Sequence, residues 1–166
     1  MIVRPAAPPD ASALIPLFER LYAETSFLLN EPGETRLSAE EQAQRIERTA
    51  ATGGGAMFVA EADGTLVGVA FGMRGGARRI RHSMNLVIGV LQAWTGRGVG
   101  RELMTALERW ARSNALHRLE LSVDTENARA IALYVKLGFE REGLKRHAHR
   151  VAGEYRDALL MSKLLS

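Results

Sequence analysis

Residues 86–100 read LVIGVLQAWTGRGVG, an apolar run that ends in a loop with glycine at three alternate positions. The residues that follow, 101–110, have apolar side chains at helical spacing, so this stretch predicts a strand, a glycine-rich turn and a helix. Glycines allow the backbone of such a turn to direct several N–H groups to one point, where the helix N-terminus adds positive potential. The stretch therefore indicates a binding site for a phosphate group.

Two common phosphate-binding loops do not fit this sequence. The dinucleotide-binding pattern requires glycine at its sixth position, and counting from Gly96 the sixth residue is Arg101. The P-loop pattern requires Gly-Lys followed by Ser or Thr, whereas Gly100 precedes Arg101 and Glu102. For an isolated Gly-x-Gly-x-Gly pattern, a tight turn that binds no ligand remains an alternative.

The remaining sequence alternates between strand and helix patterns. Ser38 followed by Glu41 predicts a capped helix over 38–51, and Asp63-Gly64 predicts a hairpin turn. We expect strands at 2–5, 57–61, 66–72, 85–91, 119–123, 139–148 and 154–163, and helices that begin near Pro8, Ser38, Gly100 and Asn127. The strand over 85–91 is almost continuously apolar, which predicts that it is buried on both faces. This order predicts an α/β fold with a mixed sheet and helices on both faces.

The composition limits the classes of function. With 166 residues, of which 46% are apolar and 25% charged, the chain fits a single domain over residues 1–166. The absence of cysteine excludes disulfides, thiolate metal sites and a cysteine nucleophile. The net charge of +3 is weak evidence for nucleic acid and equally suits a polyanionic small molecule. Residues 1–10 have no signal core, and no stretch approaches the roughly 18 apolar residues of a membrane span, so we expect a cytoplasmic protein.

A second motif follows the glycine loop and reads Asn127-x-x-Ala130-x-x-Leu133-Tyr134-x-x-x-Gly138-Phe139. Together the two motifs resemble the GNAT superfamily of N-acetyltransferases, whose Gln/Arg-x-x-Gly-x-Gly/Ala loop binds the pyrophosphate of acetyl-CoA. Thr95 stands where that loop usually has Gln or Arg. Residues 82–90 and 153–161 look like those of bacterial acetyltransferases of free amino acids. The resemblance implies a GNAT-like mixed, mostly antiparallel central sheet that is splayed at the strands beside the loop.

The resemblance also implies roles for individual residues. Tyr134 would act as the general acid that protonates the departing thiolate, although the same side chain also fits a purely structural core position. A backbone N–H near Val90 would stabilise the oxyanion. The residues that would bind acetyl-CoA are Ile88, Gly89 and Val90 along the pantetheine arm, Gly96, Arg97, Gly98, Val99, Gly100 and Arg101 at the pyrophosphate, and Asn127, which also fits a helix N-cap.

The general base is not evident from the sequence. Many relatives place a carboxylate on the strand before or after the loop, and none stands directly at those places here. The remaining candidates are His82, Glu120 acting through water, and Asp124. Each of these residues also fits a surface or hydrogen-bonded structural position, so the base stays unassigned.

A metal site is not expected. His147-x-His149 on a predicted strand would place both imidazoles on one face. A metal ion needs further ligands with supporting partners, and the sequence suggests none nearby.

The sequence thus predicts an enzyme that transfers the acetyl group of acetyl-CoA directly to the primary amine of a small molecule such as an amino acid. A protein N-terminal or lysine acetyltransferase is the first alternative, and a nucleotide- or nucleic-acid-binding module without catalysis is the second. We expect coenzyme A and a small amine as partners, with no nucleic acid and no membrane. A homodimer is a possible assembly.

Overall fold

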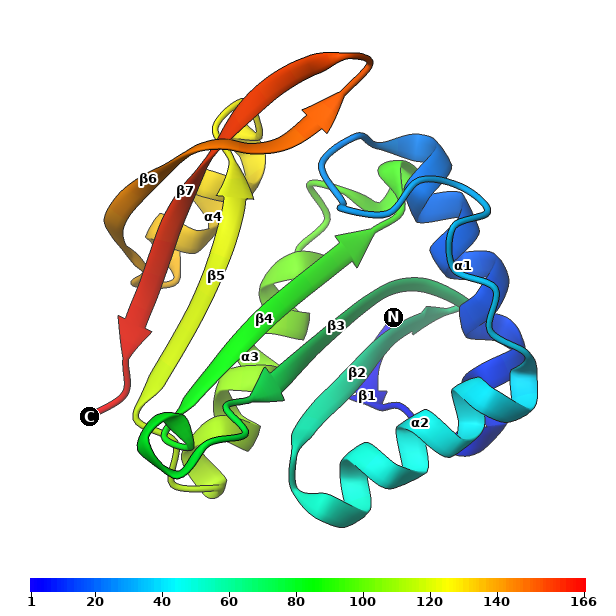
Figure 1. The fold of residues 1–166 in the computed structure, drawn as a ribbon. Helices are drawn as coiled ribbons and strands as arrows, with labels where there is room; N and C mark the ends of the chain where they lie inside the picture. The colour runs from blue at the N-terminus through cyan, green and yellow to red at the C-terminus, as the bar shows by residue number, and fades with distance from the viewer.

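The computed structural model describes residues 1–166 and contains one seven-stranded sheet with four α-helices (Figure 1). The strands are β1 (Ile2–Pro5), β2 (Gly55–Ala62), β3 (Thr65–Arg74), β4 (Ser83–Val90), β5 (Arg118–Asp124), β6 (Glu140–Val151) and β7 (Glu154–Leu164). The helices are α1 (Ala11–Glu24), α2 (Ala39–Thr52), α3 (Val99–Ser113) and α4 (Ala128–Lys136). The predicted order of strands and helices is therefore confirmed.

Turn chemistry fixes the two hairpins. Asp63 and Gly64 have φ angles of 50° and 73°, and Ala152 and Gly153 have φ angles of 49° and 87°. Two successive residues in the left-handed region form the turn type whose twist matches that of the paired strands. The predicted hairpins at Asp63-Gly64 and around Gly153 are thus observed, as β2–β3 and β6–β7.

The sheet has the strand order β1-β2-β3-β4-β5-β7-β6, and β4 and β5 form its only parallel pair. These two strands are paired only where Ser83–Asn85 runs beside Arg118–Glu120. Beyond that point β4 remains paired with β3 and β5 remains paired with β7, so the two strands diverge and leave a gap between them (Figure 1). We call this region the splay gap. It confirms the predicted mixed, mostly antiparallel sheet that splays beside the loop.

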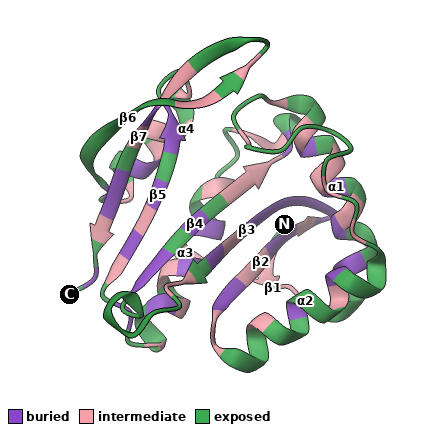
Figure 2. Cartoon of the chain, in the orientation of Figure 1, coloured by how far each residue is buried: buried purple, intermediate pink, exposed green.

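Helices cover both faces of the sheet, which we call front and back (Figure 1). On the front, the Phe18 ring of α1 packs edge-on against Phe71 of β3, and a side chain at Gly89 would meet Leu21 of α1. On the back, α3 packs so closely that a side chain at Gly68 of β3 would meet Leu103. Buried residues gather on the strands and on the helix surfaces that face them (Figure 2). None of the four helices combines the length and apolar character needed to cross a membrane.

The expectation that the strand over 85–91 is buried on both faces is wrong. Its back-facing residues Met84 and Leu86 are buried, whereas the front-facing Asn85 is exposed and Val87 is 38% exposed. The front helices cover β1 to β3 and reach β4 only near Gly89, which faces Leu21 of α1, so Asn85 and Val87 are left uncovered on the front. The continuous apolar run therefore reflects one packed face and one open face.

Candidate active site

The splay gap exposes backbone groups of β4. Leu91 donates its N–H to the Val67 carbonyl of β3 at 3.0 Å, and the register of β3 and β4 is continuous from there. Because alternate residues of an antiparallel ladder turn their amides the same way, Gly89 also turns its amide to β3. Ile88 and Val90 therefore turn their N–H and C=O groups toward the gap, where β5 is too far away to pair with them.

The glycine loop lies directly after β4 and before α3. Gly96 and Gly98 have φ angles of 75° and 86°, and Gly98 is the N-cap of α3. A Cβ atom at either position would meet nothing within 4 Å, so the left-handed backbone is the reason for glycine there. The N–H groups of residues 96 to 101 make no hydrogen bond within the chain and lie at a helix N-terminus, which is a favourable place for an anion.

Gly100 and Val99 connect this loop to the core. A Cβ atom at Gly100 would lie 3.1 Å from the Leu133 side chain of α4 and 3.7 Å from that of Ile88. The missing side chain therefore lets the first turn of α3 approach both α4 and β4. Val99 is only 1% exposed, so its side chain belongs to the core and its backbone alone is available to a ligand.

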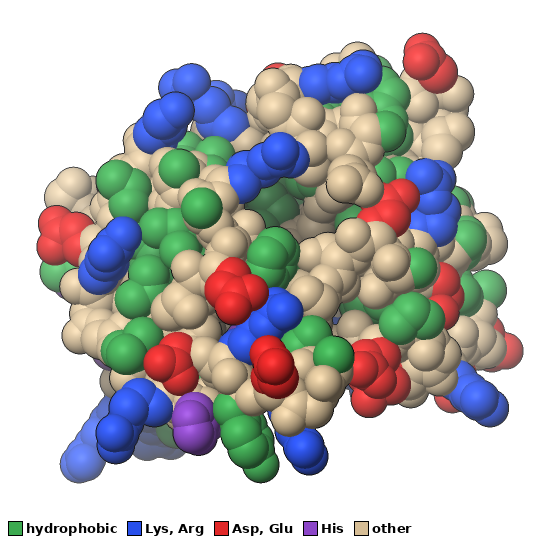
Figure 3. Space-filling view, turned by 90° about the horizontal axis from the view of Figure 1, so that it is seen from above, with side chains coloured by type: hydrophobic (Ala, Val, Ile, Leu, Met, Phe, Trp, Pro, Cys, Tyr) green, Lys and Arg blue, Asp and Glu red, His purple; other side chains and the backbone are tan.

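Three arginines surround the loop. Arg97 lies over the Trp94 ring, 5.1 Å from its centroid, and Arg101 is exposed on the first turn of α3. Arg129 of α4 donates a hydrogen bond from Nη1 to Thr95 Oγ1, so it supplies positive charge from the opposite helix. Sequence reasoning missed Arg129, although its position two residues after Asn127 was a signal. From above, the surface is hollowed near its centre, with basic side chains beside the hollow (Figure 3).

The helix α4 holds the two residues predicted from the second motif. Asn127 is its N-cap, since Asn127 Oδ1 accepts the N–H of Ala130 at 3.2 Å. Tyr134 is 7% exposed, and its ring packs on Phe139 with 5.8 Å between centroids. Burial raises the pKa of Tyr134 to about 12, and no hydrogen bond within the chain offsets that effect. The hydroxyl therefore keeps its proton at neutral pH and has no partner within the chain.

The three candidate bases lie in different environments. His82 precedes β4 at the end remote from the glycine loop, roughly 25 Å from Val90 at about 3.3 Å per strand residue. Glu120 accepts a hydrogen bond from Arg118 Nε at 2.8 Å and lies where β4 and β5 are still paired, before the gap opens. Asp124 ends β5 beside the gap, and its side chain is fully buried. The structure thus brings only Asp124 to the region of the open amides.

The two histidines of β6 do not share a face, contrary to expectation. The pairing of β6 with β7 is irregular between Lys145 and His149, and His147 has a φ angle of 49°. The His147 ring stacks on Tyr155 at 4.9 Å, whereas His149 contacts Asp124. A β-bulge causes this divergence, because it changes which face the following side chains point to. No group of three or more His, Cys, Asp or Glu side chains is arranged to hold a metal ion.

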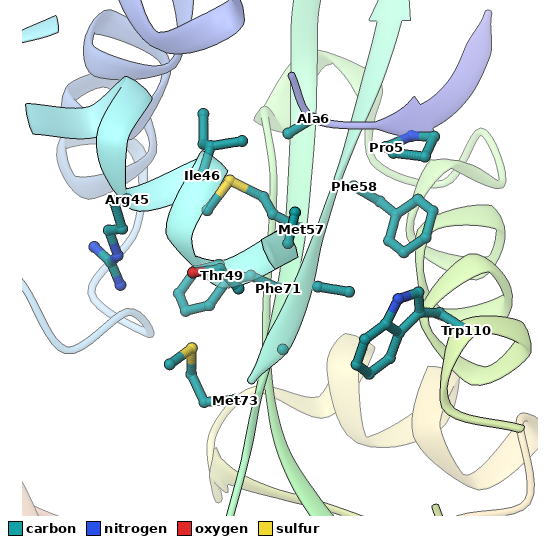
Figure 4. Close-up of a pocket in the computed structure, with 13 residues that line it drawn as sticks. Pro5, Ala6, Arg45, Ile46, Thr49, Met57, Phe58, Phe71, Met73 and Trp110 are labelled. Carbon is teal, nitrogen blue, oxygen red and sulfur yellow. The ribbon is translucent and has the colours of Figure 1, made fainter. Parts of the chain in front are cut away.

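A partly open, mostly apolar pocket lies elsewhere, beside β2. It has a volume of about 210 Å³ and is lined by residues that include Ile46, Met57, Phe71 and Trp110 (Figure 4). It is separated from the splay gap by β3 and β4. A larger hollow of about 490 Å³ adjoins Gly98, Arg101 and Arg109 along α3. Its lining also includes Glu102 and Val3 of β1, so this hollow lies toward the β1 edge of the sheet and not at the splay gap.

Residues 17–139 match the model of the acetyltransferase (GNAT) family, and this range contains both motifs. The chain belongs to the GNAT family. The predicted family is therefore confirmed. GNAT acetyltransferases use acetyl-CoA as co-substrate, which agrees with an anion site beside unpaired strand amides.

Two named GNAT relatives differ in their acceptors. The N-alpha-acetyltransferase RimI of Mycobacterium tuberculosis is 42% identical over 94 residues, which are 57% of this chain and 58% of that protein. The alignment thus spans less than two thirds of RimI. The L-amino acid N-acetyltransferase AaaT of Escherichia coli is 38% identical over 124 residues, which are 71% of this chain and 74% of that protein.

Solved structures share the GNAT fold along nearly the whole chain. An acetyltransferase of the GNAT family from Streptococcus pneumoniae has a TM-score of 0.95 and 30% identity, with 99% of each chain covered. The yncA protein of Salmonella typhimurium, solved with its cofactor acetyl-CoA, has a TM-score of 0.88 and 22% identity, covering 99% of this chain and 94% of that one. The second likeness concerns the fold alone. The predicted fold class is confirmed.

Proposed function

We propose that the chain is an N-acetyltransferase that transfers the acetyl group of acetyl-CoA to the primary amine of a small molecule such as an amino acid. One observation carries this proposal: unpaired amides at Ile88 and Val90 face the splay gap, and the glycine loop lies behind that gap against α4. Folded proteins pair nearly all of their backbone amides when these are shielded from water. Two unpaired backbone amides beside an anion site therefore suit a ligand that has both amide and phosphate groups.

Acetyl-CoA fits this arrangement by its chemistry. The amide groups of its pantetheine arm would pair with Ile88 and Val90 as an added strand does. The loop amides and the nearby arginines Arg97, Arg101 and Arg129 would hold the pyrophosphate. Asn127 uses Oδ1 as a helix cap, which leaves its Nδ2 group as a donor to the same arm. Gly89 turns its amide to β3, so its contribution would be the lack of a side chain beside Leu21.

The reaction requires a proton donor for the leaving thiolate and donors for the oxyanion. An amide that faces the gap, at Ile88 or Val90, would donate a hydrogen bond to the oxyanion from a fixed position. Tyr134 would protonate the leaving thiolate, since its hydroxyl retains its proton and makes no hydrogen bond within the chain. A positioned general acid of this kind contributes about 10²–10⁴ to the rate. No covalent intermediate on the protein is needed for a direct attack by the amine.

The top of the front face favours a small acceptor. Arg156 of β7 lies 3.3 Å from Ser26 Oγ in the segment after α1, so the β6–β7 hairpin and the α1–α2 connection meet there. This contact narrows the route by which an acceptor reaches the gap from the front. The similarity to AaaT, which is named as an L-amino acid N-acetyltransferase, supports the same class of acceptor.

A protein N-terminus is the second candidate acceptor. RimI, the relative with 42% identity, is named as an N-alpha-acetyltransferase. The front surface of β5 and β7 is open below the hairpin, where Ser122, Leu160 and Leu164 are exposed. An extended peptide would need such a surface, so the acceptor has to be decided by experiment.

An acceptor panel tests the proposal. Purified protein is mixed with acetyl-CoA and, in turn, free amino acids, polyamines and peptides with free N-termini, and the release of coenzyme A thiol is measured. We expect turnover with one or more free amino acids, and mass spectrometry should find the product heavier by one acetyl group. Turnover with peptides alone would show that the acceptor is a protein N-terminus and not a free amino acid. No turnover with any amine would refute the acetyltransferase proposal.

A further inference from the structure

Three charged or titratable side chains from three strands meet at the top of β5. His149 Nε2 of β6 lies 2.7 Å from Asp124 Oδ2, and Arg156 Nη1 of β7 lies 3.4 Å from the same oxygen. The other carboxylate oxygen, Asp124 Oδ1, accepts the N–H of Glu126 at 2.8 Å. The Asp124 side chain is 0% exposed. The proposed cofactor contacts do not use this cluster.

The cluster lies at the height of the open amides. The last paired residues of β4 and β5 are Asn85 and Glu120, with Ile88 three residues further along one strand and Asp124 four further along the other. At about 3.3 Å per residue, both positions lie roughly 10–13 Å beyond the last pair. Ile88 and Asp124 therefore stand opposite each other across the splay gap.

The cluster and Tyr134 approach the gap from opposite faces. Asn85 and Glu120 are paired and share the front face, and side chains alternate along a strand, so Asp124 also points to the front. Tyr134 belongs to α4, which packs behind the sheet, where Leu133 contacts the position of Gly100 (Figure 1). An amine that arrives from the front would thus meet the cluster on its own side, with the proposed general acid on the other.

The hydrogen bond to Asp124 determines which nitrogen of His149 is free. Burial raises the pKa of Asp124, but the Glu126 amide, His149 and Arg156 outweigh it and keep that pKa below its usual value. An ionised carboxylate can only accept, so Nε2 donates and a neutral imidazole has its lone pair on Nδ1. Nδ1 makes no hydrogen bond within the chain, and the His149 side chain is 18% exposed.

We propose that His149 is the general base of the acetyl transfer and that Asp124 is its positioning residue. The inference rests on the proposed function and names the group that removes the proton from the acceptor. A buried carboxylate that holds an imidazole in one tautomer and stabilises its protonated form is the arrangement used by Ser-His-Asp hydrolases. Here it comes from the end of β5 and the bulged part of β6.

Two proton transfers accompany the attack of the amine on the thioester. The nitrogen of the neutral amine attacks the thioester carbon, and one nitrogen proton passes to Nδ1 of His149 as the C–N bond forms. The C–S bond breaks with its electron pair on sulfur, and the thiolate takes the phenolic proton of Tyr134. The imidazolium then loses a proton to solvent and the phenolate gains one, which restores both residues.

The surrounding charges favour a base over a carboxylate-binding site. The charged groups around His149 are Asp124 of β5, Arg156 of β7 and, beyond it, Glu126 at 3.5 Å from Arg156. Asp157 of β7 accepts the His147 N–H at 2.8 Å and so holds the bulge. The single guanidinium of Arg156 is thus already flanked by two carboxylates, which leaves little positive charge for an acceptor carboxylate.

The substitution His149→Gln separates the two roles of this side chain. Glutamine retains an N–H donor for Asp124 but has no group that accepts a proton at neutral pH. We expect an unchanged fold and acetyl-CoA affinity, a decrease of about 10²–10⁴ in kcat/KM for the best acceptor, and loss of the acidic limb of its pH profile. The matched control is His147→Gln on the same hairpin, which should retain the wild-type rate and pH profile.

The outcomes of this experiment distinguish a general-base role of His149 from a structural role. A folded His149→Gln variant with wild-type kcat/KM and an unchanged pH profile would overturn it and leave the acetyltransferase proposal standing. If the wild-type protein acetylates no amine, the proposed function fails, and the base assignment fails with it. If His149→Gln does not fold by circular dichroism, Asp124→Asn is measured instead. A positioning role requires a shifted pH profile in that variant, and a purely structural role predicts an unshifted one.

Discussion

At the scale of single residues, Tyr134 gives the sharpest prediction for the acid side of the reaction. Tyr134→Phe removes the hydroxyl and keeps the ring that packs on Phe139. Because the hydroxyl has no partner within the chain, the free energy of unfolding should change by less than ~1 kcal/mol. We expect kcat to fall by about 10²–10⁴ while KM for acetyl-CoA stays nearly constant, as measured by steady-state kinetics.

The pH dependence of the wild-type kcat provides a second test of Tyr134. Burial places the pKa of Tyr134 at about 12, so the acid form persists well above neutral pH. The wild-type kcat should therefore show no loss from tyrosine ionisation below about pH 10, and any such loss should begin only as the pH approaches that pKa. Near wild-type turnover of Tyr134→Phe would mean that another group or a water molecule protonates the thiolate.

Not every site residue could be found from the sequence. Asn127 and Tyr134 are part of a spaced motif on one helix, so local periodicity sufficed to single them out. Asp124 and His149 are 25 residues apart on different strands and meet only because a bulge redirects His149. No local pattern predicts a bulge of this kind, so His147 and His149 looked equivalent in the sequence.

At the scale of elements, the glycine loop predicts an effect of charge on cofactor binding. Gly98 has a left-handed backbone, which aspartate and asparagine both tolerate better than most residues. Gly98→Asp should weaken coenzyme A binding at least about tenfold more than Gly98→Asn, because only the first places a negative charge beside the pyrophosphate. Isothermal titration at low and high salt checks this, and the difference between the variants should shrink as salt screens the charge. Equal dissociation constants for the two folded variants would mean that the loop does not contact the pyrophosphate.

Most of the elements could be predicted because local signals were strong. The capping box at Ser38, the Asp63-Gly64 turn and the helix N-cap at Asn127 are all observed. The burial of β4 on both faces is not observed, because a run of apolar residues does not reveal whether a helix covers the second face. Coverage depends on where α1 ends, and that is a property of the tertiary structure.

At the scale of the whole molecule, the sheet consists of two parts joined by one short parallel contact. Strands β1 to β4 form one part and β5 to β7 the other, connected where Ser83–Asn85 pairs with Arg118–Glu120. Above this contact, the parts are linked across the front by Arg156 and Ser26 and across the back by Arg129 and Thr95. A ligand strand in the gap would therefore lie between the two parts where β4 and β5 are not paired.

This architecture predicts how acetyl-CoA should change the stability of the fold. A ligand that binds only the folded state stabilises it by about 2.7 kcal/mol at a hundred times its Kd. For a chain of this size, that corresponds to a rise in Tm of roughly 5–10 °C, which differential scanning fluorimetry can measure. Gly98→Asp at the same ligand concentration should show a smaller rise.

Hydrogen exchange can then test where the stabilisation arises. The amides of Ile88 and Val90 face the splay gap and should become protected when acetyl-CoA is added, because they would pair with the pantetheine arm. The amide of Gly89 lies between them but is already paired with β3, so its protection should change much less. This alternation within three consecutive residues distinguishes strand-like pairing from general tightening. A rise in Tm with uniform protection of all three amides would contradict the proposed pose.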